Sequence, residues 1–310
     1  MTGKRILIIG SSNTDMSVKS DRLPRPGETV LGTGFRMGPG GKGANQAVAA
    51  RRLGGDAAFI CKIGRDLFGQ QALEHYRSCG LDTSHILYSE KPSGIALITV
   101  DAHAENSIVV ASGANADVTE KDIDASADMI RSAGLLLLQL EIPMAAVVRA
   151  AKIAHEAGVP VVLNPAPAAE LPEELLRCVS VIVPNETEAA YLTGIEIHDE
   201  LSAVTAAGRL KSKGAGSVII TMGSKGALVY DGEAVLIPAH EVNAVDTTAA
   251  GDTFCGALCV GIAEGRTLES AARFASAASA LAVQKHGAQD SIPTREEAEK
   301  LLTTNDTNNK

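Results

Sequence analysis

Short runs of apolar residues alternate with segments of helical periodicity along most of this chain. The apolar runs predict buried strands, and the Ala-rich or amphipathic segments between them predict helices. The predicted strands are residues 5–9, 57–63, 135–140, 161–163, 179–183, 217–222, 227–230 and 234–237. The predicted helices are residues 43–53, 68–79, 119–132, 144–157, 200–213, 250–263 and 268–285. This alternation predicts an α/β protein with a three-layer αβα, Rossmann-like fold around a mostly parallel sheet.

Two segments interrupt the alternation. Residues 13–39 contain Gly, Pro and Thr without a helical period, and residues 94–100 and 107–110 have the pattern of a hairpin. Both segments suit a small β-sheet that serves as a lid. We therefore expect a main α/β domain of residues 1–12, 40–90 and 112–304, and a small β lid of residues 13–39 and 91–111. The polar residues 305–310 are expected to form a frayed tail.

Composition excludes several classes of protein. Of the 310 residues, 45% are hydrophobic, which excludes a disordered chain. Acidic residues outnumber basic ones by 37 to 28, and the net charge of −9 disfavours nucleic acid as a partner. Aromatic residues make up only 3% and Trp is absent, so a platform that stacks nucleic-acid bases is not expected.

The five cysteines have neither CxxC spacing nor neighbouring His pairs, so neither a disulfide framework nor a zinc site is expected. No apolar run approaches the length of a membrane span. The chain passes directly from Met1 into the first predicted strand, which leaves no room for a signal peptide. These features predict a cytoplasmic protein that does not bind membranes.

The first candidate site is the glycine-rich segment GPGGKG at residues 38–43. It matches GxGxxG, but Pro39 lies inside it and no strand directly precedes it, which argues against a nicotinamide cofactor. Gly40, Gly41 and Gly43 still let the backbone approach a ligand before a helix N-terminus, and Asn45 adds an amide. A tight turn with a helix cap explains this segment alone equally well.

The second candidate is DTTAAGD at residues 246–252, which leads into a predicted helix. Small residues at a helix start allow several N–H groups to point at one anion, assisted by the helix dipole. Asp252 could merely complement that dipole. Its place beside an anion hole suggests instead a base that accepts a hydroxyl proton while the N–H groups stabilise phosphoryl charge.

Polar residues also follow other predicted strands. Asn185 and Glu188 follow residues 179–183, where they suit either a ligand site or a helix cap. Residues 221–226 follow the next strand, and their two glycines suit a turn against a nucleotide or an ordinary β-turn. Asn13, Asp15 and Glu141 lie at the ends of other strands. Carboxylates and amides at one sheet edge suit a ligand with several hydroxyl groups.

The segments GGKGANQ (40–46) and DTTAAGD (246–252) resemble the two signatures of the PfkB carbohydrate kinase family. The resemblance extends through residues 27–29, 113–115, 164–167, 184–188 and 285–289, and Ala249 stands where many members have Gly. It implies a three-layer α/β domain, a β lid and a homodimer in which the lids pack together. It also implies ATP-dependent transfer of phosphate to the 5-hydroxyl of D-ribose.

The resemblance also implies a role for each matching residue. Asp252 would be the base, and the N–H groups of Ala249, Ala250, Gly251 and Asp252 would form the anion hole. The residues expected to hold the sugar are Asn13, Asp15, Gly41, Lys42, Gly43, Asn45, Glu141 and Asp252. Those expected to contact the nucleotide are Asn185, Thr221, Met222, Gly223, Ser224, Lys225, Gly226, Gly251 and Ser276. Asn185 and Glu188 would act on Mg²⁺ through water. The positions expected to bind an activating K⁺, several of them through backbone oxygen, are Asp246, Thr248, Ala282, Lys285, Gly287 and Ser291.

Two alternatives remain at this point. One is a related kinase for 2-deoxyribose, another pentose or a nucleoside; Asn13 and Asp15 together favour a sugar with both ring hydroxyls. The other is a sugar-binding regulator without catalytic activity. The presence of Asp252, Gly251 and Asn185 argues against that second alternative.

Overall fold

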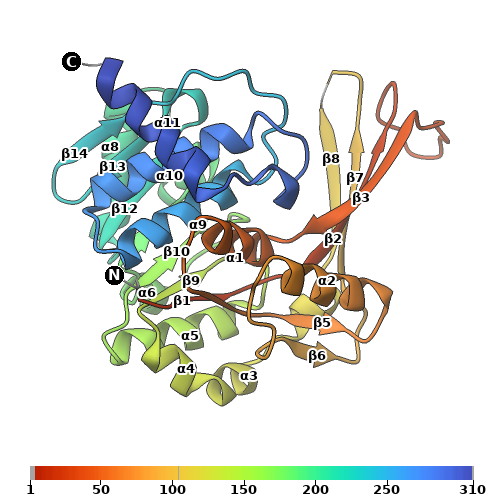
Figure 1. Cartoon of the computed structure of the whole chain (residues 1–310), viewed down its shortest axis with the longest axis horizontal. Coiled ribbons are helices and arrows are strands. Elements are labelled where there is room, and N and C mark those ends of the chain that lie inside the picture. Colours follow the sequence, from red (N-terminus) through yellow and green to blue (C-terminus); the bar gives the residue numbers. More distant parts are fainter. Residues whose placement is uncertain (1–3, 104, 309–310) are drawn as a thin grey trace.

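A computed structural model describes residues 4–103 and 105–308 of the chain (Figure 1). Its centre is an eight-stranded sheet in the order β14-β13-β12-β11-β10-β9-β1-β4, in which β13 alone runs opposite to the other strands. The strands are β1 (Ile6–Ile9), β4 (Ala57–Ile60), β9 (Leu135–Leu138), β10 (Val161–Leu163), β11 (Val181–Ile182), β12 (Ser217–Thr221), β13 (Ala227–Tyr230) and β14 (Ala234–Ile237). The α/β class predicted from the sequence is confirmed.

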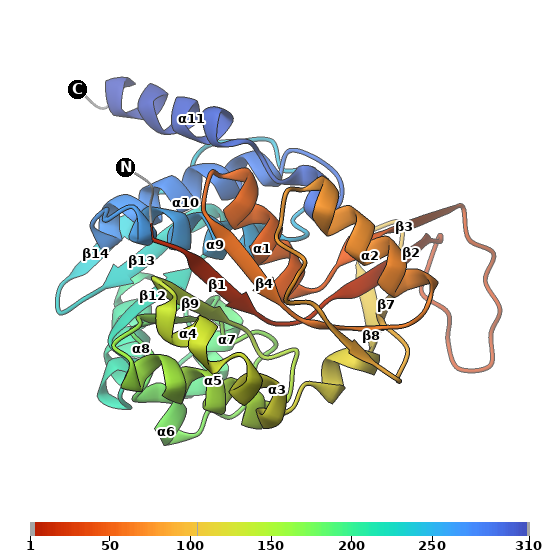
Figure 2. The same ribbon diagram turned by 60° about the horizontal axis from the view of Figure 1, so that its bottom comes forward.

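Helices cover both faces of this sheet (Figure 2). On one face lie α1 (Lys42–Arg52), α2 (Leu67–Ser78), α9 (Ala250–Ala263), α10 (Leu268–Ala282) and α11 (Arg295–Asn308). On the other face lie α3 (Glu120–Ala125), α4 (Ala127–Ser132), α5 (Met144–Glu156), α6 (Glu173–Leu176), α7 (Glu186–Thr193) and α8 (Glu200–Ser212). The sequence of β1 is entirely apolar because both faces of this strand are buried. Ile6 and Ile8 pack into the first layer, whereas Leu7 and Ile9 pack into the second.

A second sheet projects from this body, at the right of Figure 1. It has the order β3-β2-β7-β8, with β2 (Asn13–Lys19), β3 (Gly34–Gly40), β7 (Gly94–Val100) and β8 (Asn106–Ala111). Strands β7 and β8 form the predicted hairpin, and β2 runs parallel to β7. We call this four-stranded sheet the lid sheet. The chain enters or leaves it at Asn13, Gly40, Gly94 and Ala111, all at the end nearest the main sheet.

Three elements differ from the sequence predictions. The single strand expected at 57–63 divides into β4 and β5 (Lys62–Gly64), and β5 pairs with β6 (Leu87–Ser89) in a separate sheet. The helix expected at 119–132 divides at Ser126 into α3 and α4. Helix α11 continues to Asn308, so it includes much of the segment expected to be frayed, while 309–310 lie outside the described residues. Across 4–103 and 105–308, helices are all too short or too polar to span a bilayer.

Candidate active site

The catalytic candidate Asp252 lies in the first turn of α9 and is 7% exposed. Its Oδ2 accepts a hydrogen bond from Asn45 Nδ2 at 2.9 Å, and its Oδ1 accepts one from Gln46 Nε2 at 2.9 Å. Both donors come from α1, which packs against α9. The two sequence signatures, about 200 residues apart in the chain, therefore meet at one carboxylate.

The N-terminus of α9 has the geometry of an anion site. Ala249 has a φ of 58°, the left-handed conformation that Gly adopts without strain. Gly would therefore suit this position without the strain that a Cβ brings. The N–H of Ala250 donates to Thr247 O at 3.2 Å, whereas the first-turn N–H groups of Gly251 and Asp252 have no acceptor within the helix. Outside its own helix turn, no heavy atom of the described residues lies within 4 Å of the position that a Cβ of Gly251 would occupy, so this side of the helix start is open.

Three sugar-binding candidates line the junction between the lid sheet and the main sheet. Asn13 and Asp15 lie on β2, and Glu141 follows β9. Glu141 Oε2 accepts hydrogen bonds from the backbone N–H of Lys42 at 2.9 Å and from Ser11 Oγ at 2.5 Å. A cavity of about 310 Å³ is lined by Asn13, Val110, Ser112, Asn115, Ala116, Leu140, Glu141, Ile142, Pro143 and Pro167. This volume suits a small polar ligand held between lid and body.

Glycines make room for these groups. A Cβ on Gly40 would lie 2.1 Å from Asp15 Oδ2, so the carboxylate occupies space that only Gly leaves free. Gly41 has a φ of 90°, and its Cβ would meet the backbone N of Asn13 at 2.7 Å. Gly43 is buried against Ser11, whose N would lie 2.5 Å from an added Cβ. Gly43 therefore allows α1 to pack close to the end of β1. It is not among the residues that line the cavity described above.

The site concentrates negative charge. Burial and the charges of Glu141 and Asp252 raise the pKa of Asp15 to about 6. Burial also raises the pKa of Glu188, as does the charge of Asp252. Burial disfavours the ammonium of Lys42, but Asp252, Glu141 and Glu188 outweigh it and raise the pKa of Lys42. One ammonium thus faces four carboxyl groups, an arrangement that favours cations and hydroxyl donors.

The nucleotide candidates lie at the ends of β11 and β12. Asn185 forms a capping box with Glu188: Asn185 Oδ1 accepts from Glu188 N at 2.8 Å, and Glu188 Oε2 accepts from Asn185 N at 2.9 Å. A β-bridge places Asn185 beside Thr221. From Thr221 the chain continues through buried Met222 into a short 3₁₀ turn, η2 (Gly223–Lys225), which includes Ser224 and is followed by Gly226.

Of the remaining nucleotide candidates, Lys225 ends the η2 turn and Ser276 lies on a different element, α10. Lys225 Nζ pairs with Glu186 Oε1 at 2.9 Å, so its ammonium is engaged within the protein. Ser276 is buried on α10. Three residues further along α10, Ser279 Oγ donates to Ala250 O at 2.9 Å and joins this helix to the start of α9.

The residues expected to bind K⁺ lie on two segments, one of which leads into the N-terminus of α9 and the other of which starts at the end of α10. Asp246 accepts from Thr248 N and from Gly287 N, each at 2.9 Å. Burial raises the pKa of Asp246, but these N–H donors outweigh it and leave the pKa lowered. Lys285, whose N–H bonds to Ala282 O, directs its ammonium at Glu297, with 3.4 Å between Nζ and Oε1. Ser291 Oγ donates to Ala288 O at 2.8 Å.

These donors fit a monovalent cation, because carboxylate and carbonyl oxygens are hard ligands and the Lys285 ammonium is directed elsewhere. In residues 4–103 and 105–308, His, Cys, Asp and Glu side chains do not gather in threes that could hold a metal ion. The five cysteines are free thiols.

Sequence reasoning missed the amides that surround the base. Gln46 contacts Asp252 directly, and Gln139, Asn164 and Gln289 lie one hydrogen bond further away. Gln46, Asn164 and Gln289 all occur in segments that carry the family resemblance. Their position in these segments is the one feature of the sequence that could have indicated a role, because an amide side chain has no characteristic spacing of its own.

Comparison with known proteins agrees with this geometry. Residues 4–295 match the pfkB family carbohydrate kinases. The chain belongs to this family. It is 46% identical over 301 residues to a ribokinase of Haemophilus influenzae, which covers 96% of this chain and 98% of that protein. It is also 37% identical to a deoxyribokinase of Salmonella typhi, over 97% of this chain and 99% of that protein.

A solved structure shows the same fold in this family. The ribokinase of Arabidopsis thaliana complexed with ribose and ATP superposes with a TM-score of 0.91 at 34% identity. The match covers 97% of this chain and 99% of the plant chain. The lid sheet and the α/β body of this family member are thus those of a known carbohydrate kinase.

Proposed function

We propose that this protein is an ATP-dependent kinase that transfers the γ-phosphoryl group to the 5-hydroxyl of D-ribose, giving D-ribose 5-phosphate and ADP. One observation carries the proposal. The carboxylate of Asp252 lies at the N-terminus of α9 and is held by Asn45 and Gln46 from the first signature. The base and the anion site are thus adjacent, as in-line transfer to a hydroxyl requires.

Each part of the site then has a step to perform. Asp15 and Glu141 accept hydrogen bonds from the sugar hydroxyls. Asn13, whose oxygen accepts from Asn115, donates through its NH₂ group to a sugar oxygen, and together these residues hold the 5-hydroxyl toward Asp252. Asp252 accepts the proton of that hydroxyl as its oxygen bonds to phosphorus. The bond between phosphorus and the β–γ bridging oxygen breaks, and ADP leaves with the electron pair. The first-turn N–H groups of α9 stabilise the charge on the transferred group.

Two cations complete the proposal. Asn185 and Glu188 are the residues that would hold Mg²⁺ through water, and its charge would offset the phosphates in an already anionic site. The segments that meet at Asp246, Thr248 and Gly287 would hold K⁺ next to the anion site. The cluster of carboxyl groups around Lys42 supports a requirement for added positive charge.

The proposal extends to assembly and location. On the face of the lid sheet opposite Asp15, apolar side chains are exposed by 38% to 67%: Val18, Phe35, Met37, Leu97 and Val109. Contiguous apolar side chains of this kind mark an interaction surface, and we propose that the lids of two subunits pack through it. Free thiols and the use of ATP suit a cytoplasmic enzyme.

Product analysis tests the proposed reaction. The protein is incubated with Mg²⁺-ATP and ribose, and the product is examined by ³¹P and ¹³C NMR. Phosphorus coupling at carbon 5 of the pentose supports the proposal, and ATP consumption without a sugar phosphate contradicts it. A parallel reaction with K⁺ replaced by a large organic cation tests the proposed K⁺ site, and a lower rate is expected.

The second candidate is 2-deoxyribose, because the chain is 37% identical to a deoxyribokinase, although it is 46% identical to a ribokinase. Rates with ribose, 2-deoxyribose and adenosine at equal concentration distinguish the substrates. We expect ribose to give the highest kcat/KM, because Asn13 and Asp15 lie together on β2 and can bind both ring hydroxyls.

A further inference from the structure

Two chains of side-chain amides end on the carboxylate of the base. The first runs from Asn164 through Gln46 to Asp252: Gln46 Nε2 lies 3.0 Å from Asn164 Oδ1 and 2.9 Å from Asp252 Oδ1. The second runs from His75 through Gln289 and Asn45 to Asp252. His75 Nε2 lies 2.8 Å from Gln289 Oε1, and Gln289 Nε2 lies 3.0 Å from Asn45 Oδ1.

Fixed groups set the direction of every amide. In the first chain, Asn164 Nδ2 donates to the backbone carbonyl of Val183 at 3.0 Å, so Asn164 Oδ1 must face Gln46. Gln46 then has to present its NH₂ group to both Asn164 and Asp252. Its oxygen points the other way and accepts from Gln139 Nε2 at 2.6 Å. If the Gln46 amide were rotated by 180°, its oxygen would face the oxygens of both Asn164 and Asp252.

The second chain is fixed from its opposite end. A carboxylate only accepts hydrogen bonds, so Asn45 must present its NH₂ group to Asp252. Asn45 Oδ1 then requires the NH₂ group of Gln289, whose oxygen in turn requires N–H on His75 Nε2. Gln289 is 1% exposed and Gln46 is fully buried, so water cannot replace either link easily.

We propose that Gln46 and Gln289 are positioning residues that hold the carboxylate of Asp252 in the orientation needed to accept the hydroxyl proton. This inference rests on the proposed function and adds residues to the same site. Both oxygens of the carboxylate have one neutral donor, which fixes the plane of the group without adding positive charge. Each oxygen keeps a free lone pair for the substrate hydroxyl.

The two residues have different expected kinetic signatures. Gln46 contacts Asp252 but none of the proposed sugar ligands on the lid sheet, so Gln46→Met lowers kcat by about 10- to 100-fold and leaves ribose affinity within about threefold. Gln289 acts through Asn45, which is itself a proposed sugar ligand. Gln289→Met therefore lowers kcat and weakens ribose binding together. The KM for ATP is unchanged in both variants.

The test compares steady-state ADP release with ribose affinity measured by calorimetry for each variant. The control is Gln70→Met on α2. Gln70 is exposed, and its side-chain Nε2 donates to Glu74 Oε1 at 3.0 Å, far from Asp252 in the sequence and on a different helix. Circular dichroism establishes that each variant is folded. If Gln46→Met does not fold, ADP release and ribose affinity are compared between Gln289→Met and the wild type.

A kcat of Gln46→Met within threefold of wild type overturns the inference, as does a parallel loss of kcat, ribose affinity and ATP affinity. If the wild type phosphorylates 2-deoxyribose rather than ribose, the proposed substrate fails, but the ratio of wild type to Gln46→Met on that sugar still tests the inference. A wild type inactive with every pentose and nucleoside overturns both.

Discussion

At the scale of single residues, the ionised form of Asp15 lowers the stability of the fold, although the proposed function needs it. It is held among other carboxyl groups, and its pKa is raised from 3.8 to about 6. Between these values the folded protein binds more protons than the unfolded chain, so the free energy of unfolding falls as pH rises through this window. In the proposed function, the ionised carboxylate offsets this cost by accepting hydrogen bonds from the sugar.

Replacing Asp15 with Asn therefore stabilises the unliganded protein. At pH 8 we expect the free energy of unfolding to rise by about 1–3 kcal/mol, because the disfavoured charge is removed. The gain disappears near pH 4, and ribose affinity falls at neutral pH. Urea unfolding at several pH values measures the first effect, with exposed Asp128→Asn as control. Equal stability of Asp15→Asn and wild type at pH 8 would contradict the role assigned to burial.

The residue scale also shows the limit of the sequence prediction. Asp252, Asn45 and Asn185 could be named in advance, because they occupy recognisable positions in motifs. Gln139 could not, since its relation to Gln46 arises only when β9 and α1 pack together. Hydrogen-bond partners that are far apart in sequence leave no periodic trace.

At the scale of elements, one buried side chain joins the lid sheet to the body. Asn115 in η1 (Gly113–Asp117) accepts from Ser12 N at 2.8 Å and donates to Ser12 O at 3.1 Å and to Asn13 Oδ1 at 2.7 Å. Ser12 and Asn13 are where the chain passes from β1 into β2. Asn115 thereby fixes both the entry of the lid sheet and the direction of the Asn13 amide.

Replacing Asn115 with Ala removes these three bonds and leaves buried polar groups unsatisfied. We expect a loss of about 2–4 kcal/mol in the free energy of unfolding and a higher KM for ribose. Thermal melting and steady-state kinetics measure the two effects. Asn106→Ala at the exposed start of β8 is the matched control. An unchanged ribose KM in folded Asn115→Ala would show that the hydrogen bonds of Asn115 to Ser12 and Asn13 have no part in sugar binding.

Most elements were predictable because periodicity marks them locally. Strands β10, β13 and β14 have the bounds expected from the sequence. The division of 57–63 was not predictable, because every residue from Ala57 to Gly64 is buried. An uninterrupted buried run does not reveal that its second half pairs with a different strand.

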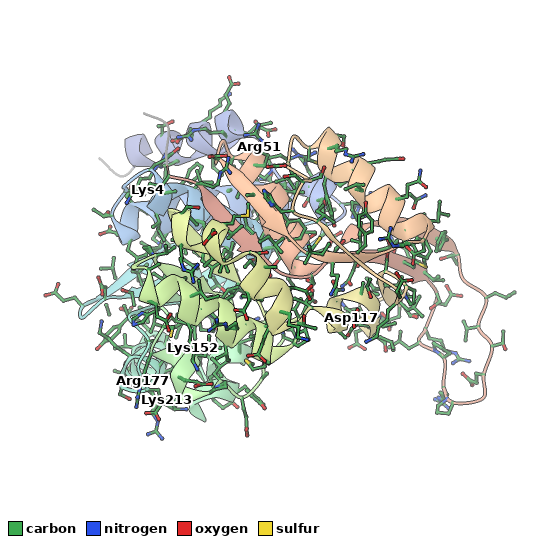
Figure 3. The ribbon with its side chains drawn as sticks, turned by 90° about the horizontal axis from the view of Figure 1, so that it is seen from below. Lys4, Arg51, Asp117, Lys152, Arg177 and Lys213 are labelled. Carbon is green, nitrogen blue, oxygen red and sulfur yellow. The ribbon has the colours of Figure 1, made fainter. Side chains whose placement is uncertain are left out.

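At the scale of the whole molecule, three basic side chains that lie near one another are each engaged within the protein. Figure 3 labels Lys152, Arg177 and Lys213 over the helices on the lower face. Lys152 pairs with Glu174 at 2.7 Å, Arg177 pairs with Glu173 at 2.7 Å, and Lys213 Nζ donates to Leu192 O at 2.6 Å. These three positive charges are therefore engaged within the protein. The more distinctive surface is the apolar face of the lid sheet.

A charge placed on that face tests assembly. Phe35 is 67% exposed, and Phe35→Asp is expected to convert a dimer into monomers by adding an unpaired carboxylate to an apolar contact. Sedimentation velocity of wild type and variant measures this. Leu201→Asp on α8, at a residue 75% exposed and on a different element, is the control. A wild type that is monomeric at micromolar concentration contradicts the proposed interface.

The most direct measurement of the central claim is ribose-dependent ADP release by the wild type and by Asp252→Asn, assayed side by side with Mg²⁺-ATP. Asn is similar in size and can keep a contact with Asn45, but it cannot accept the hydroxyl proton. We predict ADP release by the wild type, loss of nearly all turnover in the variant, and similar ribose affinity in both. Near-normal turnover by folded Asp252→Asn would contradict the assignment of Asp252 as the base.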